Sequence, residues 1–174
     1  LRYGTKAKYD SFLLLDINEG VGSGLILNGK LNKGVMGHGN ELGHVTIDMN
    51  GPKCQCGNYG CAELYSSIPN IVAQAKALDE SLINWKTIVE FAYSGVPTAL
   101  KILKREAEYI ATMAVTAINI LDIQAVVLTG QVAYNPELLI SMIEEEINNR
   151  IFTRLSRTVK VLRSQISRNS QALL

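Results

Sequence analysis

The sequence predicts one α/β domain built on a mixed sheet. Two observations support this class: strand-like and helix-like segments alternate after residue 97, and a hairpin signal stands beside an apolar strand near the start. The chain has 174 residues, of which 47% are hydrophobic and 19% charged. Such a chain can bury a core of its own, and this excludes a disordered tail.

The N-terminal segments predict a hairpin next to a central strand. Residues 9–16 are most apolar from 12 to 15 and end in a polar turn at 18–20, as expected of a strand buried on both faces. Residues 22–27 predict a second strand. The dipeptide Asn28-Gly29 then predicts a tight turn into Lys30-Leu31.

The middle of the chain predicts a shaped loop followed by helices. Seven glycines between residues 34 and 60 leave only the run 45–49 able to form a regular element. Apolar spacing predicts helices over 62–65 and 68–78. A long helix begins at Pro97 and ends near Leu121, and its small or apolar residues on several faces predict burial between layers.

The last third predicts strand, helix and strand again. A strand over 123–129 precedes Asn135-Pro136, which we expect to cap and begin a helix that runs to Arg150. A strand follows at 159–162, and residues 171–174 begin a further helix that is cut short. A loose basic cluster is expected to be a solvated helix face leading into a strand: Arg150, Arg154, Arg157, Lys160 and Arg163.

Charge and hydropathy exclude two classes of protein. Seventeen basic residues face sixteen acidic ones, so the chain lacks the electrostatic footprint of a dedicated nucleic-acid binder. Its apolar runs are far shorter than a membrane span. The start of the chain has neither an initiating Met nor a secretory signal, which predicts a cut piece of a longer chain. Three cysteines clustered within eight positions fit a reduced compartment, so a cytoplasmic origin is expected.

Four residues in the glycine-rich region predict a metal site: His44, Cys54, Cys56 and Cys61. Three thiolates and one imidazole complete a tetrahedral structural zinc site and leave no position for a catalytic water. Cysteines can also be small buried apolar residues, but this segment is too polar and too rich in glycine for a core. His38 is a weaker rival ligand, and we expect it to face solvent.

Two carboxylates flank the predicted metal loop, Glu41 before His44 and Glu63 after Cys61. Carboxylates accept paired hydrogen bonds from neighbouring hydroxyl groups, so the two residues could form a wall that binds a polyol. Alternatively, the negative charge of Glu63 only stabilises the N-terminus of a helix through the helix dipole, and Glu41 is a surface charge. Composition alone leaves both interpretations open.

The motifs around these residues resemble the ROK family of bacterial repressors and sugar kinases. The run Glu41-Leu-Gly-His44, followed by Cys54-Gln-Cys56-Gly57-Asn-Tyr-Gly60-Cys61-Ala-Glu63, is similar to the paired signatures of that family. Residues 20–24 with 28–31 look like its second phosphate hairpin, and residues 126–130 look like its adenosine strand. The resemblance covers essentially the whole chain.

The resemblance implies an actin-like, ribonuclease-H-like lobe with a zinc-bound loop. His44, Cys54, Cys56 and Cys61 would bind zinc, while Glu41, His44 and Glu63 would contact a sugar. One ring nitrogen of His44 can bind the metal while the other serves the sugar. Residues 1–174 would form one domain, the C-terminal sugar-binding lobe, without the upstream lobe or a helix-turn-helix.

Departures from the family pattern favour a sensor over a kinase. The phosphate hairpin is degenerate (Glu19, Gly20, Gly22, Gly24), because Asn18 and Glu19 replace a Gly-Thr pair, and Gln131 replaces a glycine at the adenosine strand. A carboxylate there would repel a triphosphate. The resemblance therefore implies the effector domain of a sugar-responsive repressor of the xylose-repressor type.

Such a repressor is expected to form a homodimer and to bind DNA only through a helix-turn-helix outside this chain. The alternative is the larger lobe of an ATP-dependent sugar kinase of the glucokinase or fructokinase type. The family's catalytic Asp belongs to the upstream lobe, so we assign no catalytic residue here.

Overall fold

A five-stranded mixed sheet, in the order β3-β2-β1-β4-β5, forms the centre of the computed structural model, which describes residues 9–165. The central strand β1 (Phe12–Ile17) pairs antiparallel with β2 (Val21–Leu27) and parallel with β4 (Ala125–Gly130). β3 (Lys30–Leu31) extends the hairpin, and β5 (Lys160–Arg163) lies parallel to β4. These pairings confirm the predicted α/β class, the mixed sheet and the N-terminal hairpin.

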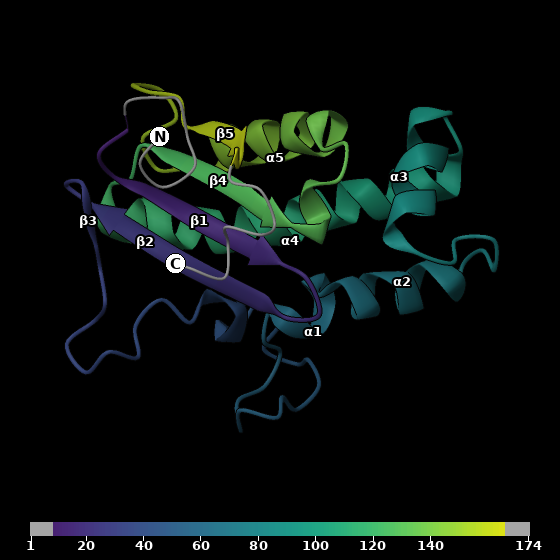
Figure 1. Ribbon diagram of the computed structural model, residues 1–174, viewed down its shortest axis with the longest axis horizontal. Coiled ribbons are helices and arrows are strands. Elements are labelled where there is room, and N and C mark those ends of the chain that lie inside the picture. Colours follow the sequence, from purple (N-terminus) through teal and green to yellow (C-terminus); the bar gives the residue numbers. More distant parts are fainter. Residues whose placement is uncertain (1–8, 166–174) are drawn as a thin grey trace.

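Helices connect the strands and cover one face of the sheet. The connection from β3 to β4 contains the 3-10 turn η1 (Leu42–His44) and the helices α1 (Glu63–Ser66), α2 (Ile68–Lys76), α3 (Trp85–Tyr93) and α4 (Pro97–Leu121). The 3-10 turn η2 (Gln131–Ala133) and α5 (Glu137–Arg150) link β4 to β5. In Figure 1, α4 runs behind the sheet and α5 lies at the top beside β5, whereas α1 lies next to the turn between β1 and β2 and α2 extends from it to the right.

Alternating residues of β1 divide the molecule into two apolar clusters. Leu13, Leu15 and Ile17 point into the main core, which is formed with the helices. Phe12 and Leu14 point to the opposite face and join a smaller cluster. β1 therefore has apolar neighbours on both sides, as predicted for a central strand. No residue of α4 between 109 and 118 is exposed, which agrees with its predicted burial between layers.

Several local predictions were wrong. Residues 45–49 form no strand and contribute only the bridge between Thr46 and Cys61, because the loop opposite them does not continue a ladder. Asn135 does not cap α5: it has a φ of 42°, and Pro136 takes the cap position without a side-chain bond.

The basic cluster predicted on a helix face lies mostly outside the helix. α5 ends at Arg150, so Arg154 and Arg157 lie in the turns that follow it and not on a helix face. Two members of the basic cluster form ion pairs with acidic residues: Arg157 with Asp122 at 2.8 Å and Lys160 with Glu144 at 2.6 Å. The helix expected at 171–174 lies outside the described residues.

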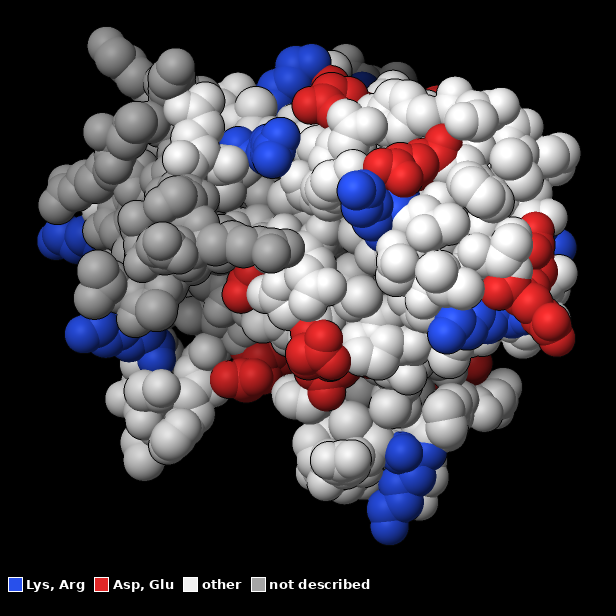
Figure 2. Space-filling view, turned by 45° about the vertical axis from the view of Figure 1, so that its right-hand side comes forward, with Lys and Arg blue, Asp and Glu red and all other residues white. Residues whose placement is uncertain are grey.

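Surface charges of both signs are present on the face shown in Figure 2. Acidic and basic side chains lie side by side at the top and right, and several acidic side chains gather at the lower centre. Among residues 9–165, no helix has the length and apolar character that crossing a bilayer requires.

Candidate functional site

The four predicted metal ligands lie together at one end of the glycine-rich loop. Every ligand atom of His44, Cys54, Cys56 and Cys61 is within 4.8 Å of the others. His44 Nδ1 is 3.7 Å from Cys54 Sγ, and Cys56 Sγ is 3.7 Å from Cys61 Sγ. Cys54 and Cys61 are buried, whereas Cys56 is exposed. The cluster could therefore hold a metal ion.

Two of the six ligand separations match those of a tetrahedral zinc ion, and all six are 4.8 Å or less. Zinc bound at about 2.3 Å from sulfur places neighbouring ligand atoms of a tetrahedron roughly 3.7 Å apart, and this is the separation of both close pairs. The Cys61 thiol favours its neutral form, so its ionisation depends on a positive partner. Burial, together with the thiols of Cys54 and Cys56, raises the pKa of Cys61 to about 12, so a thiolate here is unfavourable without a positive partner.

Backbone hydrogen bonds bring the ligands together from both ends of the loop. Ala62 N donates to Val45 O at 3.0 Å and Ile47 N donates to Gly60 O at 2.8 Å, so that the chain after His44 runs beside the chain around Cys61. A tight turn, in which Gly57 N donates to Cys54 O at 3.0 Å, presents the other two cysteines. The backbone N–H of Asn58 lowers the pKa of the Cys56 thiol.

Of the two predicted sugar-wall carboxylates, Glu63 is held at Val21, and Glu41 belongs to a segment that packs on Val21 through Gly43. Glu63 is the first residue of α1, and its Oε2 accepts a hydrogen bond from Val21 N at 3.0 Å. Glu41 precedes η1 and is exposed. Gly43 of η1 packs so closely on β2 that an added Cβ would lie 2.3 Å from Val21 O. Val21 therefore joins the Glu41–His44 segment to Glu63.

His44 lies between the thiol cluster and β2. Its Nδ1 faces the thiol cluster, and the segment that carries it is packed against β2 beside Glu63. Coordination through Nδ1 would leave Nε2 available for a hydrogen bond. His38, the rival ligand, is exposed in the loop before η1 and lies outside the metal cluster.

The residues of the degenerate phosphate hairpin lie in and after the turn between β1 and β2. Glu19 is exposed at the turn, next to Gly20. A Cβ on Gly20 would lie 2.8 Å from Glu63 Oε2, so the turn is packed against that carboxylate. Gly22 and Gly24 belong to β2.

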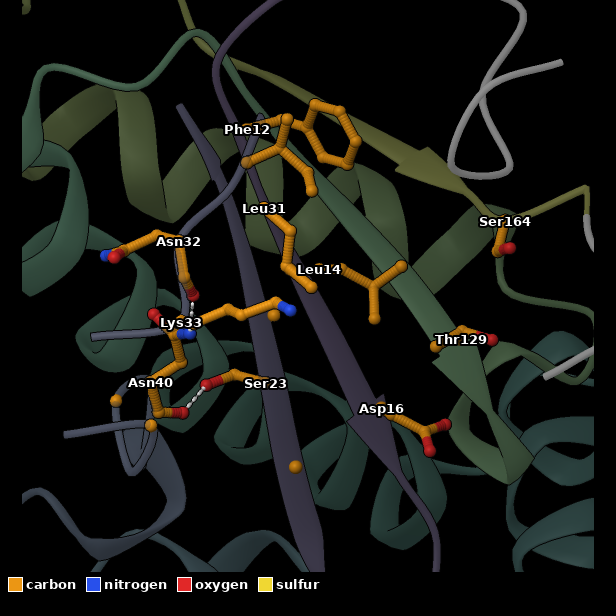
Figure 3. A pocket seen from close by; sticks show the side chains of 15 residues that line it. Phe12, Leu14, Asp16, Ser23, Leu31, Asn32, Lys33, Asn40, Thr129 and Ser164 are labelled. Carbon is orange, nitrogen blue, oxygen red and sulfur yellow. Dashed lines mark hydrogen bonds between the residues drawn. The ribbon is translucent and has the colours of Figure 1, made fainter. Parts of the chain in front are cut away.

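A pocket of about 480 Å³ occupies the other face of the sheet, away from α4 and α5. Its apolar side is formed by Phe12, Leu14, Ile26 and Leu31, and Asp16, Ser23 and Thr129 add polar groups (Figure 3). This pocket was not predicted from the sequence. The outward positions of β1 contain its signal, because they are apolar at Phe12 and Leu14 and polar at Asp16.

Two further polar residues were missed by the sequence analysis. Asn18 was treated as a replaced glycine, yet its side chain bonds to both Asp16 and Gln131. Glu106 is buried in α4 at 2% exposure. Its position, three residues after Leu103 and four before Ile110, repeats the apolar spacing of the helix and could have revealed a buried carboxyl.

Comparisons with known proteins agree with this geometry. The chain is 30% identical over 171 residues to the xylose repressor of Bacillus subtilis strain 168, covering 98% of this chain and 44% of that protein. A ROK family glucokinase from Streptomyces griseus, solved with glucose and AMPPNP, matches with a TM-score of 0.85 and 25% identity, over 94% of this chain and 58% of that one.

A third match is a ROK family transcriptional regulator described as a homologue of the Escherichia coli MLC protein. Its TM-score is 0.82 at 26% identity, over 92% of this chain and 43% of that one. The chain thus spans about half the length, or less, of these relatives. The model of the ROK family matches residues 2–174. The chain belongs to the ROK family.

Proposed function

We propose that this chain is the sugar-sensing effector lobe of a ROK transcriptional regulator. One observation supports this most directly: Gly43, the neighbour of the metal ligand His44, and the carboxylate of Glu63 both contact the backbone of Val21. Gly43 contacts the Val21 carbonyl, and Glu63 accepts a hydrogen bond from the Val21 N–H. The Glu41–His44 segment and Glu63 therefore border the same part of β2.

In this proposal, His44, Cys54, Cys56 and Cys61 hold a zinc ion. The ion supplies no reaction chemistry: it fixes the loop and the ring of His44, because ligation sets both the tautomer and the ring orientation. Glu41 and Glu63 then accept hydrogen bonds from neighbouring hydroxyl groups of a sugar, and His44 offers its remaining ring nitrogen. DNA binding and self-association would belong to the intact regulator.

Substitution of the carboxylates tests the proposal. Glu63→Gln and Glu41→Gln keep side-chain shape but replace a charged acceptor by an amide, so each should weaken sugar binding by about 10- to 100-fold, or roughly 1–3 kcal/mol. Isothermal titration of the full chain with D-xylose and D-glucose measures this, and Glu145→Gln on the exposed side of α5 is the matched control. Unchanged affinity in both wall variants would contradict the proposal.

A second candidate is the larger lobe of a sugar kinase. It is favoured by the TM-score of 0.85 with a glucokinase solved with glucose and AMPPNP. Two features of this chain argue against it. Glu19 places a carboxylate at the turn that would face phosphates, and the side chain of Asn18 already occupies the backbone N–H of Gln131.

A further inference from the structure

Asn18 joins three segments that are distant in the sequence. Its side-chain Nδ2 donates to Asp16 Oδ1 at 2.9 Å, and its Oδ1 accepts from Gln131 N at 2.8 Å. Its backbone carbonyl accepts from Ile68 N, at the start of α2, at 2.8 Å. The turn between β1 and β2 is thereby tied both to the end of β4 and to the α1–α2 segment.

The Asn18 amide is held in one orientation. Its donor faces a carboxylate and its acceptor faces an N–H group, so an exchange of its two ends would break both bonds. Gly130 covers it closely: a Cβ there would lie 2.8 Å from Asn18 Nδ2 and 2.6 Å from Asp16 Oδ1, and the backbone has a φ of +83°. The close packing leaves the amide little room to move.

Glu63 is attached to the same turn. Val21, three residues after Asn18, donates its N–H to Glu63 Oε2 at 3.0 Å. The backbone carbonyl of Glu63 accepts from Ser67 N at 3.1 Å, directly before Ile68. The turn therefore contacts the α1–α2 segment twice, once through the Glu63 carboxylate and once through the Asn18 carbonyl, and the Asn18 side chain fixes this unit to β4.

We propose that Asn18 is a positioning residue that locks the β1–β2 turn to the end of β4 and thereby sets the direction of the Glu63 carboxylate. The proposal rests on the proposed sugar-binding role of Glu63 and adds the residue that orients it. It also couples the predicted sugar wall to the C-terminal end of β4. A shift of the turn relative to β4 changes where Glu63 points.

A polarity swap tests the link. Asn18→Asp keeps an acceptor for Gln131 N but sets a carboxylate against Asp16. The double variant Asp16→Asn/Asn18→Asp exchanges donor and acceptor and rebuilds both bonds. Asn148→Ala is the matched control, because its side chain likewise bridges two elements, with bonds of 2.7–2.9 Å to Glu144 and Val159. The full chain is used throughout.

Two measurements are compared. Hydrogen exchange of the Val21 amide, which Glu63 protects, should accelerate at least tenfold in Asn18→Asp, return toward the parent rate in the double variant, and stay unchanged in Asn148→Ala. The affinity for D-xylose and D-glucose should follow the same order, with a loss of about tenfold.

The proposal is overturned if Asn18→Asp leaves Val21 exchange unchanged, or if the double variant fails to restore it. Asn18→Ala is a second variant that removes both side-chain bonds. If Asn18→Ala does not fold, the Val21 exchange rate of the double variant Asp16→Asn/Asn18→Asp tests the proposal. If the parent chain binds neither sugar, the proposed function fails, while Val21 exchange still decides whether Asn18 positions Glu63.

Discussion

Glu106 is a carboxylic acid placed in the apolar core. Its side chain is 2% exposed in α4, and neither its Oε1 nor the nearby Ser66 hydroxyl has a hydrogen-bond partner within residues 9–165. Burial raises its pKa well above the usual value, and the Ser66 hydroxyl and the Arg105 charge only partly oppose that rise. Glu106 is therefore neutral at pH values where an exposed glutamate is ionised.

This burial predicts a pH-dependent cost of folding. Because the folded chain binds the Glu106 proton more tightly, stability from this group is full below the unfolded pKa near 4.5 and falls as pH rises toward the folded pKa. Glu106→Gln should remove that slope. It should stabilise the protein relative to the parent at pH 8 more than at pH 5, by about 1–3 kcal/mol.

Urea unfolding at the two pH values measures this difference. Glu108→Gln, an exposed neighbour on α4, is the control and should leave the slope in place. An equal effect of Glu106→Gln at pH 5 and pH 8 would show that the buried carboxyl does not set the pH dependence.

At the level of helices, strands and loops, the sequence predicted most where local signals are strong. The Asn28-Gly29 dipeptide marked the hairpin, Pro97 marked the start of α4, and three clustered cysteines with His44 marked the metal loop. Each signal is contained in a few neighbouring residues, and the structure shows the elements and the ligand cluster in those places.

Other features depend on partners that lie far away in the sequence. α3 is a different case: it was not predicted, although its signal is local, because the Asn84 side chain caps it by accepting a hydrogen bond from Thr87 N at 2.9 Å. Asn18 looked like an ordinary turn residue, since its partner Gln131 lies 113 positions later. The outward residues of β1 give only part of the signal for the pocket next to Asp16, because its other walls come from separate strands and loops.

At the scale of the whole molecule, the end of β4 and the β1–β2 turn are joined at one end of the sheet. Asn18 joins these two parts, and Glu19 adds an exposed negative charge beside them. Because these groups disfavour ATP, we expect the full chain to show no thermal shift with millimolar Mg-ATP. Binding would be easy to detect, since a ligand at 100 times its dissociation constant stabilises the folded state by about 2.7 kcal/mol. A sugar that does bind is the positive control. A clear shift with ATP would restore the kinase interpretation.

The predicted metal loop and the proposed sugar wall are joined through η1 and Val21. The most direct test is isothermal titration of the full chain with its sugar in three states: as purified with zinc, after removal of zinc by a chelator, and after zinc is added back. We predict that removal weakens binding at least tenfold and that added zinc restores it. A folded, zinc-free chain that binds the sugar with unchanged affinity would contradict the account.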